Sequence, residues 1–249
     1  MGKLTNKIAL VTGASKGIGA GIAKAFGREG ATVVVNYVSD KAGAENTAKA
    51  ITNAGGKAVV VGGSVAVTAE REALFTEVKK QFGRLDILVN NAGVYGWSPL
   101  ESTEEAEFDR QYNTNVKGLL FTTKAALPLF GPEGGSIINI SSVVATRSFP
   151  NSSVYSSTKG AVDTVTRVLS AELGPKKIRV NSLSPGLIIT EGLKTFTGGD
   201  DSFEKQVMAT TPLGRVGQPD DTADVALFLA SDDARWVTGS ILEVAGGSR

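Results

Sequence analysis

Tyr155 and Lys159 stand four positions apart in the stretch VYSSTKGAV, residues 154–162. On a helix, residues at i and i+4 lie on the same face, so a phenol and an ammonium group would sit side by side. A cation about 4 Å from a phenolate gains about 4 kcal/mol at an effective dielectric near 20, or roughly 3 pK units. The pair therefore predicts a tyrosine whose pKa falls from about 10 towards 7 and that acts as a general acid or base. A half-exposed tyrosine over the stem of a surface lysine is the alternative interpretation.

The residue types that the chain lacks narrow the chemistry. Its 249 residues include no cysteine and no histidine. This excludes disulfides, thiolate nucleophiles, Ser-His-Asp hydrolysis and the usual zinc sites, and we expect no metal. Acid–base work near pH 7 falls to Asp, Glu, Lys or Tyr.

Charge and hydropathy exclude two classes of partner. The formal net charge is +1 and there is no long basic run, so we expect no nucleic acid partner. No segment approaches the roughly 20 apolar residues of a membrane span, so we expect no membrane partner. The first residues, MGKLTNKIALVTG, lack a signal-peptide pattern, which favours a cytoplasmic protein.

Short apolar runs alternate with segments of helical periodicity. The runs that predict strands are 8–13, 31–37, 57–63, 86–93, 136–142, 178–186 and 240–247; helices are expected over about 17–30, 41–54, the region through Phe82, 104–130, the segment from Tyr155 to about Leu173, and 220–229. This pattern predicts a single α/β domain over residues 1–249, a Rossmann-like, doubly wound parallel sheet of about seven strands with helices on both faces. The least periodic region, 187–211, is interpreted as a substrate lid.

A glycine-rich turn, TGASKGIG at residues 12–19, follows the first strand and opens a helix. Glycines permit a tight turn, and a helix N-terminus presents free N–H groups to an anion. The spacing of Gly13, Gly17 and Gly19 matches neither G-x-G-x-x-G nor the P-loop. Its place in a doubly wound sheet favours a dinucleotide site over a plain turn.

The second strand ends with Asn36 and Tyr37, where an NAD site usually carries an acid that binds the ribose 2′-hydroxyl. An amide does not repel a 2′-phosphate, and Lys16 inside the glycine turn is placed to pair with one. Ser39 and Lys41 are expected to assist, and the nearby Asp40 is interpreted as a solvated helix cap. NADP is therefore the favoured cofactor, with NAD as the alternative.

The motifs occur in a specific order along the chain. They are TGxxxGIG at residues 12–19, NNAG at 90–93, Asn115 in NTNVKG, ISS at 140–142, the Tyr155-x-x-x-Lys159 pair and PG at 185–186. This combination resembles the short-chain dehydrogenase/reductase family from about Leu4 to Gly247, and in particular its carbonyl reductase and 3-oxoacyl-carrier-protein reductase branch.

The resemblance implies a role for each of four residues. Tyr155 would protonate the carbonyl oxygen as hydride arrives, and Lys159 would lower its pKa and bind the nicotinamide ribose. Ser142, rather than Ser141, would hold the substrate oxygen. Asn115 would hold a water that relays protons to Lys159, or serve as the amide of a helix kink.

The resemblance also implies the cofactor contacts. Many relatives carry Asp after the third strand to bind the adenine amino group, whereas this chain has Ser64 there, which puts that contact in doubt. Asn90 is expected to be partly structural in the turn after the fourth strand. The expected contacts are Gly13, Ser15, Lys16, Gly17, Ile18, Gly19, Asn36, Tyr37, Ser39, Ser64, Val65, Asn91, Ala92, Gly93, Tyr155, Lys159, Pro185, Gly186, Ile188 and Thr190.

Similar proteins include 3-oxoacyl-carrier-protein reductases, sugar or alcohol dehydrogenases and broad ketoreductases. A carrier protein is acidic and calls for basic residues at the mouth of the site, but LFGPEGG at 129–135 has none. Lys176, Lys177 and Arg179 would form at most half of the basic patch that an acidic carrier protein needs. We therefore expect an oxidoreductase of small free ketones or keto esters, with a pocket lined by Val143, Ala145, Phe149 and Leu187.

Two further expectations concern the class and assembly of the protein. A non-catalytic NADP-binding sensor or scaffold is the alternative from another class, because fold does not fix function. The resemblance implies a homotetramer, with segments 104–130 and 152–174 forming one interface and residues 236–247 forming the other.

Overall fold

Seven parallel strands form one sheet in the order β3-β2-β1-β4-β5-β6-β7 in the computed structural model, which describes residues 2–197 and 200–248. The strands are β1 (Ile8–Val11), β2 (Thr32–Tyr37), β3 (Lys57–Gly62), β4 (Ile87–Asn90), β5 (Gly135–Ile140), β6 (Ile178–Pro185) and β7 (Ile241–Val244). The strands between the two edges are mostly buried and rich in Val, Ile and Leu, as in a sheet covered on both faces, whereas the edge strands β3 and β7 are partly exposed. The predicted doubly wound α/β fold is confirmed.

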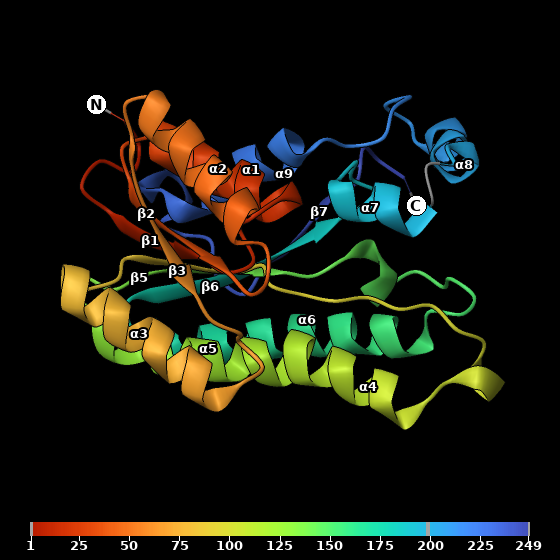
Figure 1. Ribbon diagram of the computed structural model, residues 1–249, viewed down its shortest axis with the longest axis horizontal. Coiled ribbons are helices and arrows are strands. Elements are labelled where there is room, and N and C mark those ends of the chain that lie inside the picture. The colour runs from red at the N-terminus through yellow and green to blue at the C-terminus, as the bar shows by residue number, and fades with distance from the viewer. Residues whose placement is uncertain (1, 198–199, 249) are drawn as a thin grey trace.

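Helices cover both faces of this sheet (Figure 1). One face carries α1 (Gly17–Arg28), α2 (Lys41–Asn53) and α9 (Pro219–Ala230), and the other carries α3 (Thr68–Phe82), α4 (Glu105–Tyr112), α5 (Leu119–Ala126) and α6 (Ser153–Leu173). Two apolar clusters match these layers, one centred on Phe26 and the other on Leu74 and Leu88.

The strand order reverses between β1 and β4, which both pair in parallel with their neighbours. At such a switch point the loops leave the carboxyl ends of adjacent strands in opposite directions and open a crevice for a ligand. The turns after β1, β4, β5 and β6 therefore meet at the edge of the sheet where the expected site lies.

Two segments differ from the expected pattern. The predicted helix over 104–130 is interrupted by a π-helical segment, Asn113–Gly118, between α4 and α5. The aperiodic region 187–211 contains two short helices, α7 (Glu191–Thr197) and α8 (Ser202–Thr210), which lie together beside one end of the sheet (Figure 1). Helical periodicity is weak there because few of the residues in these helices are buried.

Within the described parts of the chain, no helix has both the length and the apolar character needed to cross a bilayer.

Candidate active site

Helix α6 carries Tyr155 and Lys159 on one face, as the spacing predicts. The ammonium nitrogen of Lys159 lies 5.6 Å from the centre of the Tyr155 ring. It donates a hydrogen bond of 2.8 Å to the carbonyl oxygen of Ile140, the last residue of β5. Only 6% of the surface of Lys159 is exposed, so the end of β5 and the face of α6 enclose the charge.

Burial dominates the acid–base properties of this pair. It raises the pKa of Tyr155 to about 12, with a smaller increase from Tyr95 and an opposing hydrogen bond with Ser142. It lowers the pKa of Lys159 to about 8. The expectation that Lys159 brings the pKa of Tyr155 towards 7 is therefore not met in this structure, because the cost of desolvating the phenolate outweighs attraction to an ammonium directed at Ile140.

Two neighbouring serines follow β5 and have different partners. The side chain of Ser142 is hydrogen-bonded to Tyr155, and its Oγ accepts the N–H of Val144 at 3.4 Å. The hydroxyl of Ser141 is buried and donates to the backbone carbonyl of Lys159 at 3.3 Å. Of the two, Ser142 is placed to share a substrate oxygen with Tyr155.

Asn115 lies in the π-helical segment, a type of helix irregularity that is frequent at functional sites. Its Oδ1 accepts the N–H of Val94 at 2.8 Å, and its Nδ2 donates to the carbonyl of Val94 at 2.8 Å and to Oγ1 of Thr158 at 3.1 Å. The side chain thus joins the loop after β4 to α6. Gly93, which precedes this loop, lies against both Asn115 and Lys159.

The glycine turn forms an anion cradle at the start of α1. Gly17 has φ +58°, a left-handed conformation that side chains other than glycine rarely adopt. A Cβ on Gly19 would collide with Nδ2 of Asn91, which itself donates to the carbonyls of Thr12 and Gly13 at 2.8 and 3.0 Å.

A carboxylate already occupies part of this cradle. The backbone N–H of Gly17 donates to Oε2 of Glu191, the first residue of α7, at 3.1 Å. This carboxylate oxygen stands in for an oxygen of a cofactor diphosphate, the group that a helix N-terminus at a switch point typically binds. The donor set therefore fits a dinucleotide.

Asn36 has a structural task that the sequence did not indicate. Its side chain is fully buried, accepts the N–H of Gly13 at 3.3 Å and donates to the carbonyls of Val61 and Gly63 at 3.1 and 3.0 Å. It ties β2 and β3 to the glycine turn through backbone groups of three segments. The expected cofactor contact of Asn36 stays a prediction beside this structural task.

The exposed residues near this end of the cradle are those expected to meet a phosphate. Lys16 and Ser39 are exposed and Tyr37 is half-buried. Asp40 caps α2 as interpreted from the sequence, since its Oδ1 accepts the N–H of Gly43 at 2.9 Å. Lys41 pairs with Glu45 at 3.6 Å along the surface of α2.

The loop after β3 uses Ser64 within its own turn. Oγ of Ser64 accepts the N–H of Ala66 at 3.2 Å, and its backbone N–H donates to Glu70 at 2.8 Å. Val65 is buried, and its carbonyl accepts a bond from Arg71 at 2.7 Å. Glu70 and Arg71 were missed by sequence reasoning, because nothing in the spacing of α3 distinguishes them from surface charges.

A pocket of about 380 Å³ opens beside Tyr155, Ser142 and Lys159. Its walls include three of the four predicted pocket residues (Val143, Phe149 and Leu187). Besides Tyr155 and Lys159, they include seven of the expected cofactor contacts (Ile18, Asn91, Gly93, Pro185, Gly186, Ile188 and Thr190). Ala145 lies outside it and lines a neighbouring hollow, because the 3₁₀ turn Val143–Ala145 directs it away. Sequence reasoning missed Tyr95, Trp97, Val144 and Arg147, whereas Leu193, Phe203 and Val207 come from the segment 187–211 that was expected to contribute side chains to the pocket.

Aromatic side chains form much of the pocket wall. The rings of Tyr95 and Tyr155 meet edge to face with centres 6.1 Å apart, and those of Trp97 and Phe149 do the same at 6.1 Å. Such pairs present broad apolar faces and hold each other in place. The pocket is therefore suited to an apolar or aromatic ligand.

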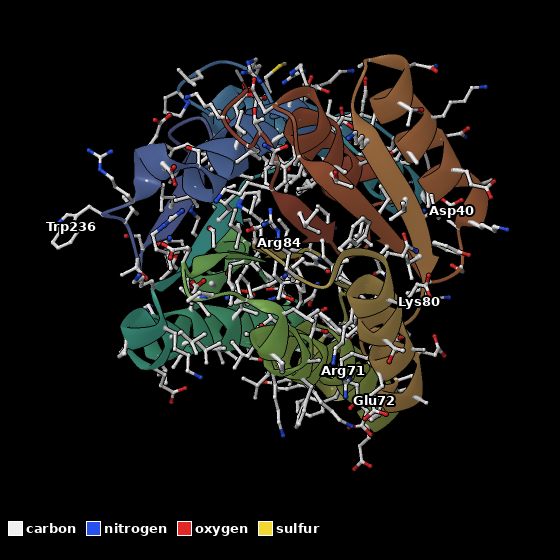
Figure 2. The ribbon with its side chains drawn as sticks, turned by 90° about the vertical axis from the view of Figure 1, so that its left-hand side faces the viewer. Asp40, Arg71, Glu72, Lys80, Arg84 and Trp236 are labelled. Atoms are coloured by element: carbon white, nitrogen blue, oxygen red, sulfur yellow. The ribbon has the colours of Figure 1, made fainter. Side chains whose placement is uncertain are left out.

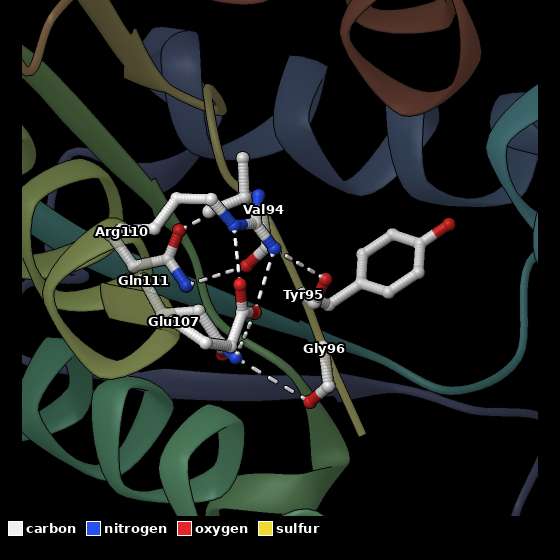
Figure 3. Close-up of polar contacts among 7 residues, drawn as sticks. Val94, Tyr95, Gly96, Glu107, Arg110 and Gln111 are labelled. Atoms are coloured by element: carbon white, nitrogen blue, oxygen red, sulfur yellow. Dashed lines mark hydrogen bonds and ion pairs between the residues drawn. The ribbon is translucent and has the colours of Figure 1, made fainter. Parts of the chain in front are cut away.

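A polar cluster on α4 fixes the segment that carries Tyr95 (Figure 3). Arg110 binds both carboxylate oxygens of Glu107, at 2.7 and 2.8 Å, and donates to the carbonyl of Tyr95 at 2.9 Å. Gln111 donates to Glu107 at 2.8 Å and to the carbonyl of Gly96 at 3.5 Å. A side chain at Gly96 would collide with Glu107, so the segment passes close to the helix.

Comparison with known proteins identifies the family. The family described as Enoyl-(Acyl carrier protein) reductase matches residues 13–249. An uncharacterized oxidoreductase of Methylorubrum extorquens is 53% identical over 249 residues, covering 100% of both chains. The chain belongs to the short-chain dehydrogenase/reductase family.

Two solved members of this family resemble the structure closely. The angucycline C-6 ketoreductase LanV with bound NADP has a TM-score of 0.93 and 37% identity, covering 99% of this chain and 97% of that one. A 7α-hydroxysteroid dehydrogenase complexed with NADH and 7-oxo glycochenodeoxycholic acid has a TM-score of 0.94 and 37% identity, covering 99% and 95%. As a family member, the protein is an oxidoreductase that interconverts C=O and CH–OH groups with NADP or NAD.

Proposed function

We propose that the protein is an NADP-preferring carbonyl reductase of free, apolar ketones and keto esters. The observation that carries this proposal is the meeting of Ser142, Tyr155 and Lys159 at the edge of an aromatic pocket, next to the anion cradle of α1. The pocket of about 380 Å³ lies in the range of small-molecule sites and has room for substituted and ring-bearing ketones beyond the smallest ones. The 7-oxo bile acid bound by the solved dehydrogenase is a ketone of that kind.

The chain's own residues provide the acid and the oxygen contacts. When bound, a reduced nicotinamide cofactor supplies the hydride. Ser142 donates a hydrogen bond to the ketone oxygen, and Tyr155 transfers its phenolic proton to that oxygen as negative charge develops there. A pKa of about 12 keeps Tyr155 protonated at neutral pH, which is the form that reduction requires.

Lys159 acts next to this acid. Its cation stabilises the phenolate that remains on Tyr155 and binds the nicotinamide ribose, as the family resemblance implies. Asn115 fixes the loop after β4 beside Lys159, and we propose that a water held there returns the proton to Tyr155. Gly93 leaves the space between these two side chains open.

The proposed preference for NADP rests on charge at the end of β2. Lys16 is exposed at the start of α1, whereas the two described carboxyl groups near it each bind a backbone N–H, Asp40 that of Gly43 and Glu191 that of Gly17. Lys16 is therefore the group placed to pair with a 2′-phosphate.

A carrier-protein substrate is less well supported. Arg179 donates to backbone carbonyls of Leu229 and Ser231 at 2.7 and 3.2 Å, so it is used inside the fold. Lys176 and Lys177 precede the first residue of β6, at the sheet edge opposite to the carboxyl ends where the pocket lies. These bases do not surround the mouth of the pocket.

The lid, the assembly and the compartment complete the proposal. Segment 187–211 contributes Leu193, Phe203 and Val207 to the pocket wall, which supports its role as a lid. Exposed apolar side chains on α4, α5 and α6 include Phe108, Phe121 and Val168, and Trp236 is 96% exposed on the loop after α9 (Figure 2). These surfaces support a homotetramer that buries both regions, and light scattering measures its mass. We propose a cytoplasmic location on the sequence alone.

A substrate panel tests the proposed function. The rate of NADPH oxidation is measured with free ketones, keto esters, a sugar, a carrier-linked 3-oxoacyl thioester and an enoyl thioester. The proposal predicts the highest kcat/KM for apolar free ketones or keto esters. Faster turnover of the carrier-linked substrate favours the 3-oxoacyl reductase alternative. Binding of NADPH without turnover of any substrate favours a sensor and contradicts the proposal.

A further inference from the structure

A buried carboxyl group continues the line of Tyr155 and Lys159 along α6. Asp163 lies four residues after Lys159, so the three side chains occupy positions i, i+4 and i+8 of one helix face. Only 4% of the surface of Asp163 is exposed. The proposed reaction assigns no task to this group, and a carboxyl so deeply buried needs polar partners.

The partners of Asp163 are hydroxyl groups from the two strands beneath α6. Ser182 in β6 donates to Oδ1 of Asp163 at 3.3 Å. Ser141, just after β5, is also hydrogen-bonded to the carboxyl, and its hydroxyl lies 3.3 Å from the carbonyl of Lys159. Ser141 therefore contacts the carboxyl of Asp163 and the backbone of Lys159, on the same turn of α6.

No cation forms a direct ion pair with this carboxylate. Among the residues that the structure describes, no lysine or arginine nitrogen lies within 4.0 Å of Asp163. Burial raises the pKa of this carboxyl, and the hydrogen bonds from Ser141 and Ser182 oppose that rise. Two cations one helical turn away, the exposed Arg167 and the buried Lys159, also favour its charged form. The attraction is mutual, since Asp163 also raises the pKa of Lys159 against the effect of burial.

The other groups that face Lys159 carry no charge in the ordinary pH range. Tyr155 on α6 and Tyr95 from the loop after β4 are phenols whose pKa values are raised by burial. The end of β5 presents the carbonyl of Ile140, and the π-helical segment presents the neutral amide of Asn115. Asp163 is the charged group that acts on Lys159 in this environment.

We propose that Asp163 is a positioning residue of the reductase: the Ser141 and Ser182 hydroxyls hold its carboxyl one helical turn from Lys159 on the shared face of α6, where its charge keeps Lys159 protonated. This inference rests on the proposed function, in which Lys159 must be a cation. Without a neighbouring negative charge, a lysine enclosed by β5 and α6 would lose its proton at lower pH. Asp163 would thereby widen the pH range in which the Tyr155–Lys159 pair works.

A purely structural role makes a different prediction. In that case Asp163 only ties α6 to β6 through Ser182, and its charge is irrelevant to Lys159. Asp163→Asn removes the charge but keeps the shape and one accepting oxygen, with the other oxygen replaced by an NH2 donor. Ser182→Ala removes the strand contact but keeps the charge, so the two variants separate the roles.

The experiment measures the pH dependence of kcat/KM for ketone reduction by the full chain and both variants. Asp163→Asn is expected to move the alkaline limb about one pH unit lower, the size of shift expected for two charges a helical turn apart at an effective dielectric near 20. Ser182→Ala is expected to leave that limb in place. Equal loss of rate at every pH in both variants, with an unmoved limb, would overturn the proposal.

A second readout does not depend on turnover. The Nζ resonance of Lys159 in ¹⁵N-lysine-labelled protein, assigned by its loss in Lys159→Met, reports the pKa of this group directly. We expect that pKa to fall by about one unit in Asp163→Asn. An unchanged pKa contradicts the inference about Asp163 even in an active enzyme, whereas a lowered pKa in a protein without reductase activity contradicts only the proposed function.

Discussion

Glu191 of α7 accepts a 3.1 Å hydrogen bond from the backbone N–H of Gly17, and thereby joins the lid to the anion cradle of α1. The two residues are 174 positions apart in the chain. A cofactor diphosphate in the cradle would compete with this carboxylate for the same N–H and would be repelled by its charge. The contact of Glu191 with Gly17 and binding of the cofactor are therefore opposed at this point.

Replacing Glu191 by Gln is expected to strengthen NADPH binding by about fivefold, the effect of one charge at a helix N-terminus. The dissociation constant is measured by the fluorescence of bound NADPH. Glu204→Gln in α8 is the control for a lid carboxyl that makes no contact with the cradle in this structure. Weaker or unchanged binding in Glu191→Gln would contradict the proposed competition.

Replacing Lys16 by Ala tests cofactor choice. If Lys16 pairs with a 2′-phosphate, NADPH binding weakens about tenfold, because a hydrogen bond to a charged group contributes about 1.5–3 kcal/mol, whereas NADH binding stays the same. Lys24→Ala, another exposed lysine on α1, controls for the change in net charge. An equal loss for both cofactors argues against the assignment.

Replacing Asn36 by Leu tests its structural task. The change leaves the N–H of Gly13 and the carbonyls of Val61 and Gly63 without this partner. We expect the free energy of unfolding to fall by about 2–4 kcal/mol in urea titrations, since buried groups lose their hydrogen bonds. Ser39→Ala at the exposed loop nearby is expected to change it by less than about 0.5 kcal/mol. A stable Asn36→Leu protein with weakened NADPH binding would instead restore the cofactor contact that the sequence suggested.

The pKa values of Lys159 and Tyr155 predict how rate and stability depend on pH. The reduction rate should fall as pH rises through about 8, where Lys159 loses its charge. In the same region the folded chain binds fewer protons than the unfolded one, because the pKa of Lys159 is lowered from 10.5 to about 8. Its contribution to stability therefore increases from about pH 8 to 10.5.

The pKa shift of Tyr155 changes stability with pH in the opposite direction. Its pKa is raised from 10.0 to about 12, so the stability that it contributes is present below pH 10 and is lost between about 10 and 12. Rate profiles and urea titrations at matched pH measure both effects. In Lys159→Met the increase in stability between pH 8 and 10 should disappear. Parallel losses of rate and stability above pH 8 in the wild-type protein would contradict this assignment.

Local patterns predicted the strands and most helices because each strand is a short apolar run, and the strands between the two edges of the sheet are mostly buried. They also predicted that Tyr155 and Lys159 share a face, since helix geometry fixes that relation. Other features depend on contacts between distant segments. The burial of Asn36 requires β3 and the glycine turn, and the aromatic wall requires Tyr95, Phe149 and Phe203 from three separate loops or helices.

The pKa of Tyr155 is a second property that the sequence pattern did not predict. The spacing to Lys159 was read correctly, but the effect of burial on a phenolate depends on the loop after β4 and on the residues that follow β5. Periodicity also did not predict the π-helical segment around Asn115, because the pattern of residues 104–130 fits an uninterrupted helix. Desolvation and helix irregularities arise from tertiary packing, which a single sequence pattern does not encode.

The most direct test of the central claim compares the wild-type protein with Tyr155→Phe in single-turnover oxidation of bound NADPH by an excess of an accepted ketone. Both proteins should bind NADPH with similar affinity, because the ring remains in place. The rate of the chemical step should fall by about 10²- to 10⁴-fold in Tyr155→Phe, the range expected for removal of a general acid. A variant that binds NADPH normally and reduces the ketone at the wild-type rate would contradict the assignment of Tyr155 as the acid of a ketone reductase.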